Sequence, residues 1–109
     1  MKKGEVWLVS IPKSENGHEQ SGSRPVLLLT EVEAGIVIII PFTSNLQALK
    51  YPHVLEIKPD KANGLKEVSA ALIFQLRAID KKRLKHKIGE LDIKSLENID
   101  GMLRKMLKL

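Results

Sequence analysis

The stretch GHEQSGSRPVLLLTEVEAGIVIIIPFTSN, residues 17–45, decides the fold of this 109-residue chain. It begins as a polar loop with two glycines and continues into an apolar strand that opens at Arg24 and Pro25. A turn at residues 33–35 leads to a second strand, which is aliphatic almost throughout and ends on the polar residues 43–45. Because the two strands carry polar groups from their ends to one place, we expect the functional site there.

The composition describes a small basic protein with enough apolar residues for a packed core. The chain is 43% hydrophobic, which excludes a disordered protein, and its length predicts a single domain over residues 1–109. Its 18 Lys+Arg against 13 Asp+Glu give a net charge of +5, which favours an anionic partner such as nucleic acid. The absence of cysteine excludes disulfides, a thiolate nucleophile and a zinc–thiolate site.

The location of the protein is predicted from two negative signals. The first 15 residues lack a secretory apolar core and cleavage site. The longest purely aliphatic run, residues 36–40, is far too short to cross a bilayer. We therefore expect a cytoplasmic protein with no membrane association.

The rest of the chain predicts a mainly β protein with one late helix. Expected strands cover residues 4–11, 53–57, 68–79 (with a bend at Ser69 and Ala70) and 87–91, and Asn63-Gly64 marks a turn. Asp80 is expected to cap a short helical turn, and Asp92 a helix over 93–107 whose apolar stripe packs on the protein's own sheet. This pattern predicts a small, mostly antiparallel, barrel-like sheet plus helix.

The strand over residues 36–42 is apolar without alternation. Strands of this kind are usually covered on both faces. In a chain this short, we expect one cover to come from the rest of the barrel and the other from a second subunit.

The backbone of Arg24 is restricted before any packing occurs, because the clash with the ring of Pro25 pushes it toward extended geometry. Its guanidinium stays charged and presents a planar fork of donors. This side chain is therefore suited to clamp a phosphate and to stabilise the extra charge of a phosphoryl transition state. The alternative is a salt bridge with Glu19 or Glu31, and the residues alone leave both open.

Thr43 and His18 are further candidates at the two ends of the stretch. The hydroxyl of Thr43 can hydrogen-bond a phosphate oxygen; the alternative is a strand-end threonine that bonds its own turn. His18 lies inside the polar loop, and an unperturbed histidine, with a pKa of about 6.5, exchanges protons near neutrality. The alternative is an idle surface histidine. His53 and His86 have less context and are assigned no role.

The segment FQLRAID places Gln75 and Arg77 on one face if residues 68–79 form a strand, where they can line a groove for bases or phosphates. The alternative is an Arg77–Asp80 surface pair, worth at most about 1 kcal/mol. The basic run 77–87 is either a nucleic-acid footprint or a solvated face. No histidines or carboxylates stand at metal-ligand spacing, so we expect no metal and no other cofactor.

Four segments resemble the MazF/PemK/Kid toxins. GHEQSGSRPVLLL (17–29) resembles their G-x-E-Q-x-G-x-R-P-V-L-V segment, and KGEVWLV (3–9) their first strand. IIPFTSN (39–45) resembles their V-V-P-x-T-S segment, and QLRAIDKKRL (75–84) their Q-x-R-T-I-D-x-x-R-L run. The match is collinear over nearly the whole chain, and four segments in the right order are specific.

The resemblance implies the toxin of a toxin–antitoxin pair, with an SH3-like small β-barrel plus helices, acting as a homodimer. Such toxins cut single-stranded RNA, usually at a short sequence, without a metal. The 2′-hydroxyl attacks the adjacent phosphate and leaves a 2′,3′-cyclic phosphate and a 5′-hydroxyl. The cognate antitoxin protein occupies the RNA groove.

The resemblance also implies roles for single residues. Arg24 matches the family's catalytic arginine, Thr43 its catalytic threonine, and His18 a histidine implicated in the plasmid-encoded members. The positions expected to bind substrate are Glu19, Gln20, Asn45 and Gln75, which match groove positions of the family, and Arg77 from the same run.

The chain departs from the plasmid-encoded members just before Gln75. Where they have an arginine and an aspartate, this chain has Leu72, Ile73 and Phe74. An acid–base scheme that rests on that aspartate cannot operate here. Since a guanidinium is a poor base, we assign transition-state stabilisation to Arg24 and phosphate orientation to Thr43. Proton transfer is assigned to His18, with Glu19 in reserve.

Two other classes of function remain open at this point. CcdB, which has a related fold, poisons DNA gyrase by contact and cuts nothing. An inactive member of the family would only bind antitoxin or RNA. Cleavage of RNA separates the nuclease from both.

Overall fold

The computed structural model describes residues 1–11 and 22–109, and in this part of the chain the fold is a curved sheet with one α-helix. The strands are β1 (Glu5–Ile11), β2 (Gly22–Val32), β3 (Ile36–Thr43), β4 (Val54–Ile57), β5 (Ser69–Leu72), β6 (Arg77–Asp80) and β7 (Leu84–Glu90). Three 3-10 turns, η1 (Leu46–Lys50), η2 (Ile73–Gln75) and η3 (Lys81–Arg83), connect strands, and α1 (Ile93–Leu107) ends the chain. The predicted fold class, mainly β with a C-terminal helix, is confirmed.

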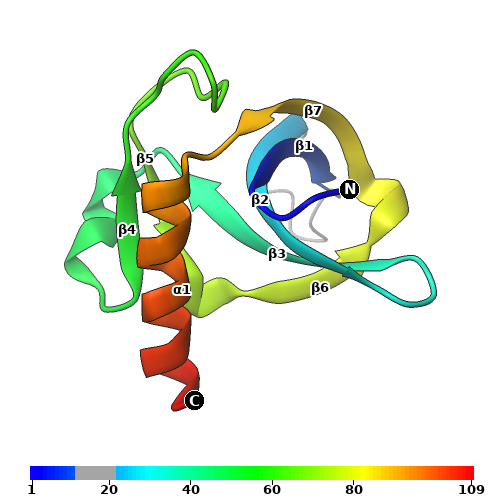
Figure 1. Ribbon diagram of the computed structural model, residues 1–109. Helices are drawn as coiled ribbons and strands as arrows, with labels where there is room; N and C mark the ends of the chain where they lie inside the picture. Colours follow the sequence, from blue (N-terminus) through cyan, green and yellow to red (C-terminus); the bar gives the residue numbers. More distant parts are fainter. Residues whose placement is uncertain (12–21) are drawn as a thin grey trace, which may run out of the picture.

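The strand order is β4-β5-β3-β2-β1-β7, with β6 also paired to β3, and every pairing is antiparallel. Strands β1, β2 and β7 curl around one end of the molecule, while β3 runs on to the β4–β5 pair (Figure 1). Register shifts in the β1–β7 and β2–β3 pairs sharpen this curvature, because a bulge bends its strand and increases the local twist. The result is the barrel-like sheet expected from the sequence.

The strand β3 separates two apolar clusters. Ile40 and Phe42 belong to a first cluster that also receives the helix α1. Val37 and Ile39, on the alternate positions, belong to a second cluster with residues of β1 and β2. The strand is therefore covered on both faces, as its composition predicts, but both covers come from the same chain. A second subunit is not needed for this purpose.

Residues 68–79 were expected to form one strand, and this prediction is wrong. The chain leaves β5 after Leu72, makes the turn η2 and resumes as β6 at Arg77. The physical reason is Ile73, which is fully buried in the first cluster and is carried there by the turn. The bend therefore lies at η2 and not at Ser69 and Ala70.

The caps read from the sequence are confirmed. Asp80 is the N-cap of η3, and its side chain accepts a hydrogen bond from Lys82 N at 2.8 Å. Asp92 is the N-cap of α1, and its side chain accepts from Ser95 N at 2.9 Å and from Ser95 Oγ at 2.7 Å. The apolar stripe of α1 packs on the protein's own sheet, as expected, with Ile99 fully buried. No helix in residues 1–11 and 22–109 has the length and hydropathy needed to span a membrane.

The one glycine inside α1 offers a test of the helix. Gly101 is exposed, and a Cβ added there meets no atom within 4 Å. We expect Gly101→Ala to raise the free energy of unfolding by about 0.5–1 kcal/mol, since alanine loses less backbone entropy in a helix. Urea unfolding measures the change. An unchanged midpoint would mean that α1 unfolds separately from the sheet.

Candidate active site

The register of the β2–β3 pair brings the ends of the two strands together. Val26 lies opposite Pro41, and Leu28 lies opposite Ile39. The pairing ends at Val26 and Pro41, but the same register continued by two residues would bring Arg24 and Thr43 to one face, and both line one pocket. The two residues that the sequence singles out from different segments are therefore neighbours in space.

A pocket of about 570 Å³ lies at these strand ends. Ser23 and Arg24 line it from β2, and Thr43 and Ser44 line it from the end of β3. Residues 64–67, from the loop between β4 and β5, also line it. Its apolar walls include Pro25 and Phe42. The pocket combines two cations, Arg24 and Lys66, with several hydroxyls and the single carboxylate of Glu67, and the cations and hydroxyls suit an anionic group.

Arg24 is exposed at this pocket. The salt bridge with Glu31 that the sequence left open is absent, since Glu31 instead pairs with Lys81 at 2.8 Å. Among the described residues, Arg24 takes part in none of the ion pairs. The alternative partner, Glu19, lies outside the described residues.

The hydroxyl of Thr43 has a structural contact that leaves it able to donate. Its Oγ1 accepts a hydrogen bond from Asn45 N at 3.1 Å, which is the turn contact considered as the alternative. A hydroxyl that accepts one bond still has its own proton to give. This contact fixes the oxygen, and within residues 1–11 and 22–109 the O–H donates to no other group, so the two interpretations of Thr43 are compatible.

The other candidate residues are not gathered around the pocket. Asn45 uses its side-chain oxygen to accept from Gln47 N at 3.1 Å, capping η1. Gln75 lies in η2 and Arg77 at the start of β6, and neither lines the pocket. The prediction that Gln75 and Arg77 share a strand face is wrong, because η2 breaks the alternation. The alternative Arg77–Asp80 pair is also absent.

Three of the predicted site residues lie outside the described part of the chain. These are His18, Glu19 and Gln20. Their proposed roles in proton transfer and substrate binding stay predictions.

Two charged residues at the pocket were missed by the sequence reasoning. Lys66 and Glu67 line its wall, and both side chains are exposed. The polar stretch that holds them predicts only a turn, and they follow no motif. Only the approach of this loop to the end of β3, through the pairing of Ala70 with Thr43, brings them to the site.

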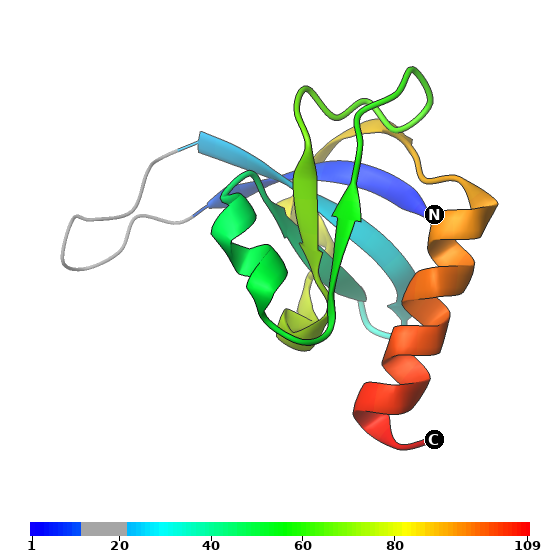
Figure 2. The same cartoon turned by 90° about the vertical axis from the view of Figure 1, so that its left-hand side faces the viewer.

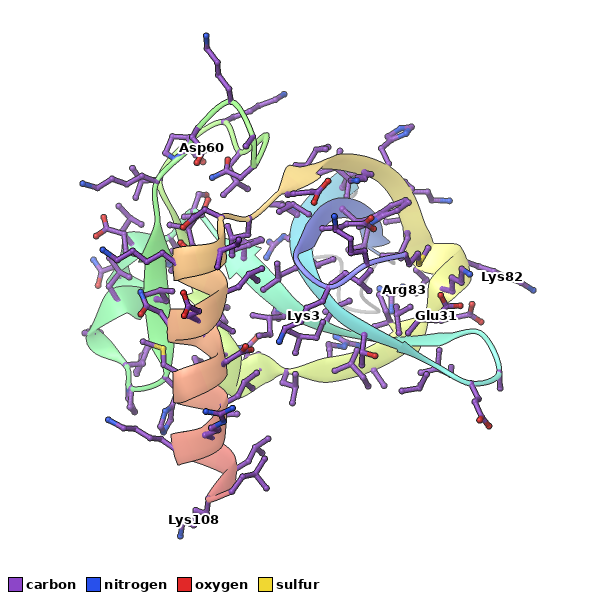
Figure 3. The ribbon with its side chains drawn as sticks, in the orientation of Figure 1. Lys3, Glu31, Asp60, Lys82, Arg83 and Lys108 are labelled. Carbon is purple, nitrogen blue, oxygen red and sulfur yellow. The ribbon has the colours of Figure 1, made fainter. Side chains whose placement is uncertain are left out.

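The basic run of residues 77–87 is partly neutralised. Lys81 pairs with Glu31, and Lys87 pairs with Glu5 and Glu90. Arg83 turns back toward the sheet and donates to the carbonyl of Ser10 at 3.2 Å, whereas Lys82 extends away from the fold (Figure 3). The run is therefore a mixture of structural and solvated cations, and only part of it is available for an anionic partner.

The ion pairs between β1 and β7 give the fold a pH dependence. Burial by itself raises the pKa of Glu5, but hydrogen bonds from the Trp7 indole, the Lys2 backbone and Lys87 lower it below the usual 4.5. A hydrogen bond from Lys87 likewise lowers the pKa of Glu90. Hydrogen bonds from Ser95 lower the pKa of Asp92.

A carboxyl group with a lowered pKa in the folded state stabilises the fold above its unfolded value, and that contribution is lost as the pH falls. We therefore expect the free energy of unfolding to be level near neutral pH and to decrease below about pH 4.5. Urea titrations between pH 7 and pH 3 measure the slope of the free energy of unfolding against pH. The variant Glu5→Gln should show a shallower slope; an identical slope would remove Glu5 from this explanation.

Comparison with known proteins decides the family. The model of the PemK-like, MazF-like toxins of type II toxin–antitoxin systems matches residues 2–107. The chain belongs to this family. The resemblance seen in its four sequence segments is thereby confirmed.

Relatives of this PemK/MazF-family chain match it from end to end. Endoribonuclease EndoA of Bacillus subtilis (strain 168) is 33% identical over 113 residues, covering 100% of this chain and 96% of the relative. The crystal structure of MazF from Deinococcus radiodurans is 28% identical with a TM-score of 0.69, covering 98% of this chain and 94% of that one. The MazE–MazF structure from the same organism is also 28% identical, with a TM-score of 0.70 and the same coverage.

Proposed function

We propose that this chain is an endoribonuclease toxin that cuts single-stranded RNA at the Arg24–Thr43 site and is held inactive by a cognate antitoxin protein. The membership in a toxin family and the name of the Bacillus subtilis relative support an endoribonuclease. The MazE–MazF structure supports a partner protein that binds such a toxin. The single observation that carries the assignment of the site is the pocket shared by Arg24 and Thr43.

The proposed reaction is a transesterification within the RNA. The 2′-oxygen loses its proton and forms a bond to the adjacent phosphorus, the bond from phosphorus to the 5′-oxygen breaks, and the 5′-oxygen takes up a proton. The products are a 2′,3′-cyclic phosphate and a 5′-hydroxyl. Negative charge accumulates on the non-bridging oxygens as the 2′-oxygen attacks, and a fixed cation beside them lowers the barrier.

Arg24 and Thr43 would act on this charge and on the position of the phosphate. The Arg24 fork donates to two oxygens of the phosphoryl group at once. The oxygen of the Thr43 hydroxyl is fixed by Asn45 N. The hydroxyl proton would be donated to an oxygen of the phosphate, which orients the phosphate. His18 would carry the proton transfers, with Glu19 in reserve, because an imidazole exchanges protons near neutral pH.

The experiment for the proposal is to map the ends of a cleaved RNA. Purified protein is incubated with a long RNA in excess chelator, and the fragments are sequenced and tested for their end groups. We expect cleavage at a short recurring sequence, with 2′,3′-cyclic phosphate and 5′-hydroxyl ends. RNA that stays intact, or cleavage that requires an added divalent cation, would contradict the proposal. Intact RNA together with capture of DNA gyrase would favour the contact toxin.

Lys66 adds a second cation to the proposed phosphate site. It lines the same pocket as Arg24, from the loop before β5. We expect Lys66→Gln to weaken RNA binding several-fold and to reduce the slope of log K against log salt by about 0.7, the value of one phosphate contact on a single strand. Titration of a 2′-deoxy-substituted oligonucleotide measures both quantities. The matched control is Lys61→Gln, on the same loop but outside the pocket; equal losses in both variants would contradict a specific role for Lys66.

We also propose that the protein is a homodimer. The support for this proposal is the family resemblance alone. The apolar faces of β3 give it no support, because both are already covered within one chain. Sedimentation of the purified protein tests it: a stable dimer is expected at micromolar concentration, and a monomer at all concentrations would contradict it.

A further inference from the structure

Two aromatic side chains stand exposed beside each other on the surface. Tyr51 is 54% exposed and Phe74 is 44% exposed. Their ring centroids are 6.3 Å apart, with the ring planes tilted by 57°. An exposed pair of large aromatic rings is an unfavourable use of apolar area unless something covers it.

The backbone holds this aromatic pair in place. Tyr51 ends the turn η1, and its N–H donates to the carbonyl of Ala48 at 3.1 Å. Phe74 lies in η2, and its N–H donates to the carbonyl of His53 at 3.3 Å. The two segments are joined through this bond, so the rings form a pre-organised surface and do not depend on a loose loop.

The aromatic pair lies close to the Arg24–Thr43 site. β5 begins beside the end of β3, where Ala70 pairs with Thr43. Phe74 follows four residues later, in η2, so the reach of the chain keeps it within about 13 Å of Ala70. The turn η1, which ends at Tyr51, begins directly after Asn45. In Figure 2, η1 and the outer ends of β1 and β2 lie on the side of the molecule away from α1. The short strand β5 thus links the pocket to the aromatic pair, while η2 itself also contacts α1.

One cation lies beside the aromatic pair, and a second follows it closely in the sequence. The Lys50 ammonium lies 5.9 Å from the centre of the Tyr51 ring. Arg77 is exposed three residues after Phe74, and the exposed amide of Gln75 lies between them. A cation and an aromatic face together suit a nucleotide, because the base stacks on the ring while the phosphate meets the charge.

We propose that Tyr51 and Phe74 form a stacking platform for a base of the RNA substrate, next to the phosphate held by Arg24 and Thr43. This inference rests on the proposed function and extends it to substrate selection. It also gives Phe74 a role of its own at the position where the plasmid-encoded members have an acid. Lys50 and Arg77 neutralise the phosphates that flank the stacked base.

The test compares cleavage by variants of the full chain on an RNA with a single cleavage site. We expect Phe74→Ala and Tyr51→Ala to lower kcat/KM between about fivefold and a hundredfold, mostly through KM, because stacking binds the substrate without touching the reacting atoms. Phe74→Trp, which keeps a ring, should retain activity, whereas Phe74→Leu, which keeps only apolar bulk, should not. Val32→Ala removes a similarly exposed apolar side chain at the far end of β2 and is the control.

A crosslinking measurement locates the contact directly. RNA that carries 4-thiouridine at single positions around the cleavage site is irradiated with the protein, and the attached peptide is identified by mass spectrometry. We expect crosslinks to Tyr51 or Phe74 from one defined position. Crosslinks only elsewhere, Leu and Trp variants of Phe74 that behave alike, or a loss of the dimer on sedimentation of Phe74→Ala would each overturn the platform.

The failure of this inference is distinguishable from the failure of the proposed function. If the unaltered protein cleaves RNA and the aromatic variants match Val32→Ala, only the platform is wrong. If the unaltered protein leaves RNA intact, the proposed function itself is wrong and the platform is wrong with it.

Discussion

Replacing Arg24 with alanine is expected to lower the rate of RNA cleavage by about 10²–10³-fold, with little change in stability. Loss of one donor aimed at developing negative charge typically costs a reaction this much. Arg24 is the cation from β2 at the pocket that Thr43 also lines, and it takes part in no ion pair among the described residues. Its removal therefore affects the substrate and not the fold.

Two further variants define the nature of this effect. Arg24→Lys keeps the charge but loses the planar fork, so we expect an intermediate rate. Arg104→Ala, which removes an exposed arginine from the last turn of α1, is the matched control and should cleave like the unaltered protein. Single-turnover rates on a short RNA measure all three. Full activity in Arg24→Ala, with the control also active, would remove this residue from the site.

Replacing Gly64 with alanine is expected to lower the free energy of unfolding by about 3 kcal/mol, since backbone overlap adds to left-handed strain. Gly64 has a φ of +71°, and a Cβ added there would come within 2.1 Å of the carbonyl oxygen of Ile88. That atom belongs to the backbone of β7, which is held by its pairing with β1 and cannot move cheaply. Because Gly64 also lines the pocket, the loop that carries Lys66 and Glu67 must shift, and cleavage should fall as well.

The chain offers a matched control for the part of this cost that comes from left-handed backbone strain. Gly35, in the β2–β3 turn, has a φ of +75°, but an added Cβ meets nothing within 4 Å. Gly35→Ala therefore carries the left-handed strain alone, about 1 kcal/mol. Urea unfolding of both variants separates the two contributions. Equal destabilisation would show that the close approach of the loop to β7 costs nothing.

The hairpin of β2 and β3 and the helix α1 were predictable because their signals are local. The Arg24-Pro25 dipeptide, the turn at residues 33–35 and the aliphatic run of β3 specify two paired strands. Asp92 and the apolar stripe likewise specify α1 and the face that it buries. In each of these cases, short-range propensity and tertiary packing favour the same structure.

The break between β5 and β6 was not predictable from local pattern. The run of residues 68–79 has the composition of one continuous strand, but Ile73 is needed in the first apolar cluster and the chain turns to place it there. Tertiary packing overrides strand propensity at this point. The faces assigned to Gln75 and Arg77 are wrong for the same reason.

The site was predictable where it depends on strand register and not where it depends on a loop. Arg24 and Thr43 follow from two adjacent antiparallel strands, which can meet in few ways. Lys66 and Glu67 come from a loop whose path is set by contacts with Gly89 of β7, which lies 23 and 22 positions away respectively by sequence number. No pattern around Lys66 encodes that approach.

The most direct test of the central claim is a double-mutant cycle between Arg24 and Thr43 in RNA cleavage. Arg24→Ala and Thr43→Val are measured singly and together, with Thr43→Ser as a control that keeps the hydroxyl. If both side chains act on one phosphate, each single change slows cleavage, and the double variant loses clearly less than the product of the two losses. Losses that multiply as independent factors, or a Thr43→Val variant as fast as the unaltered protein, would contradict a shared site.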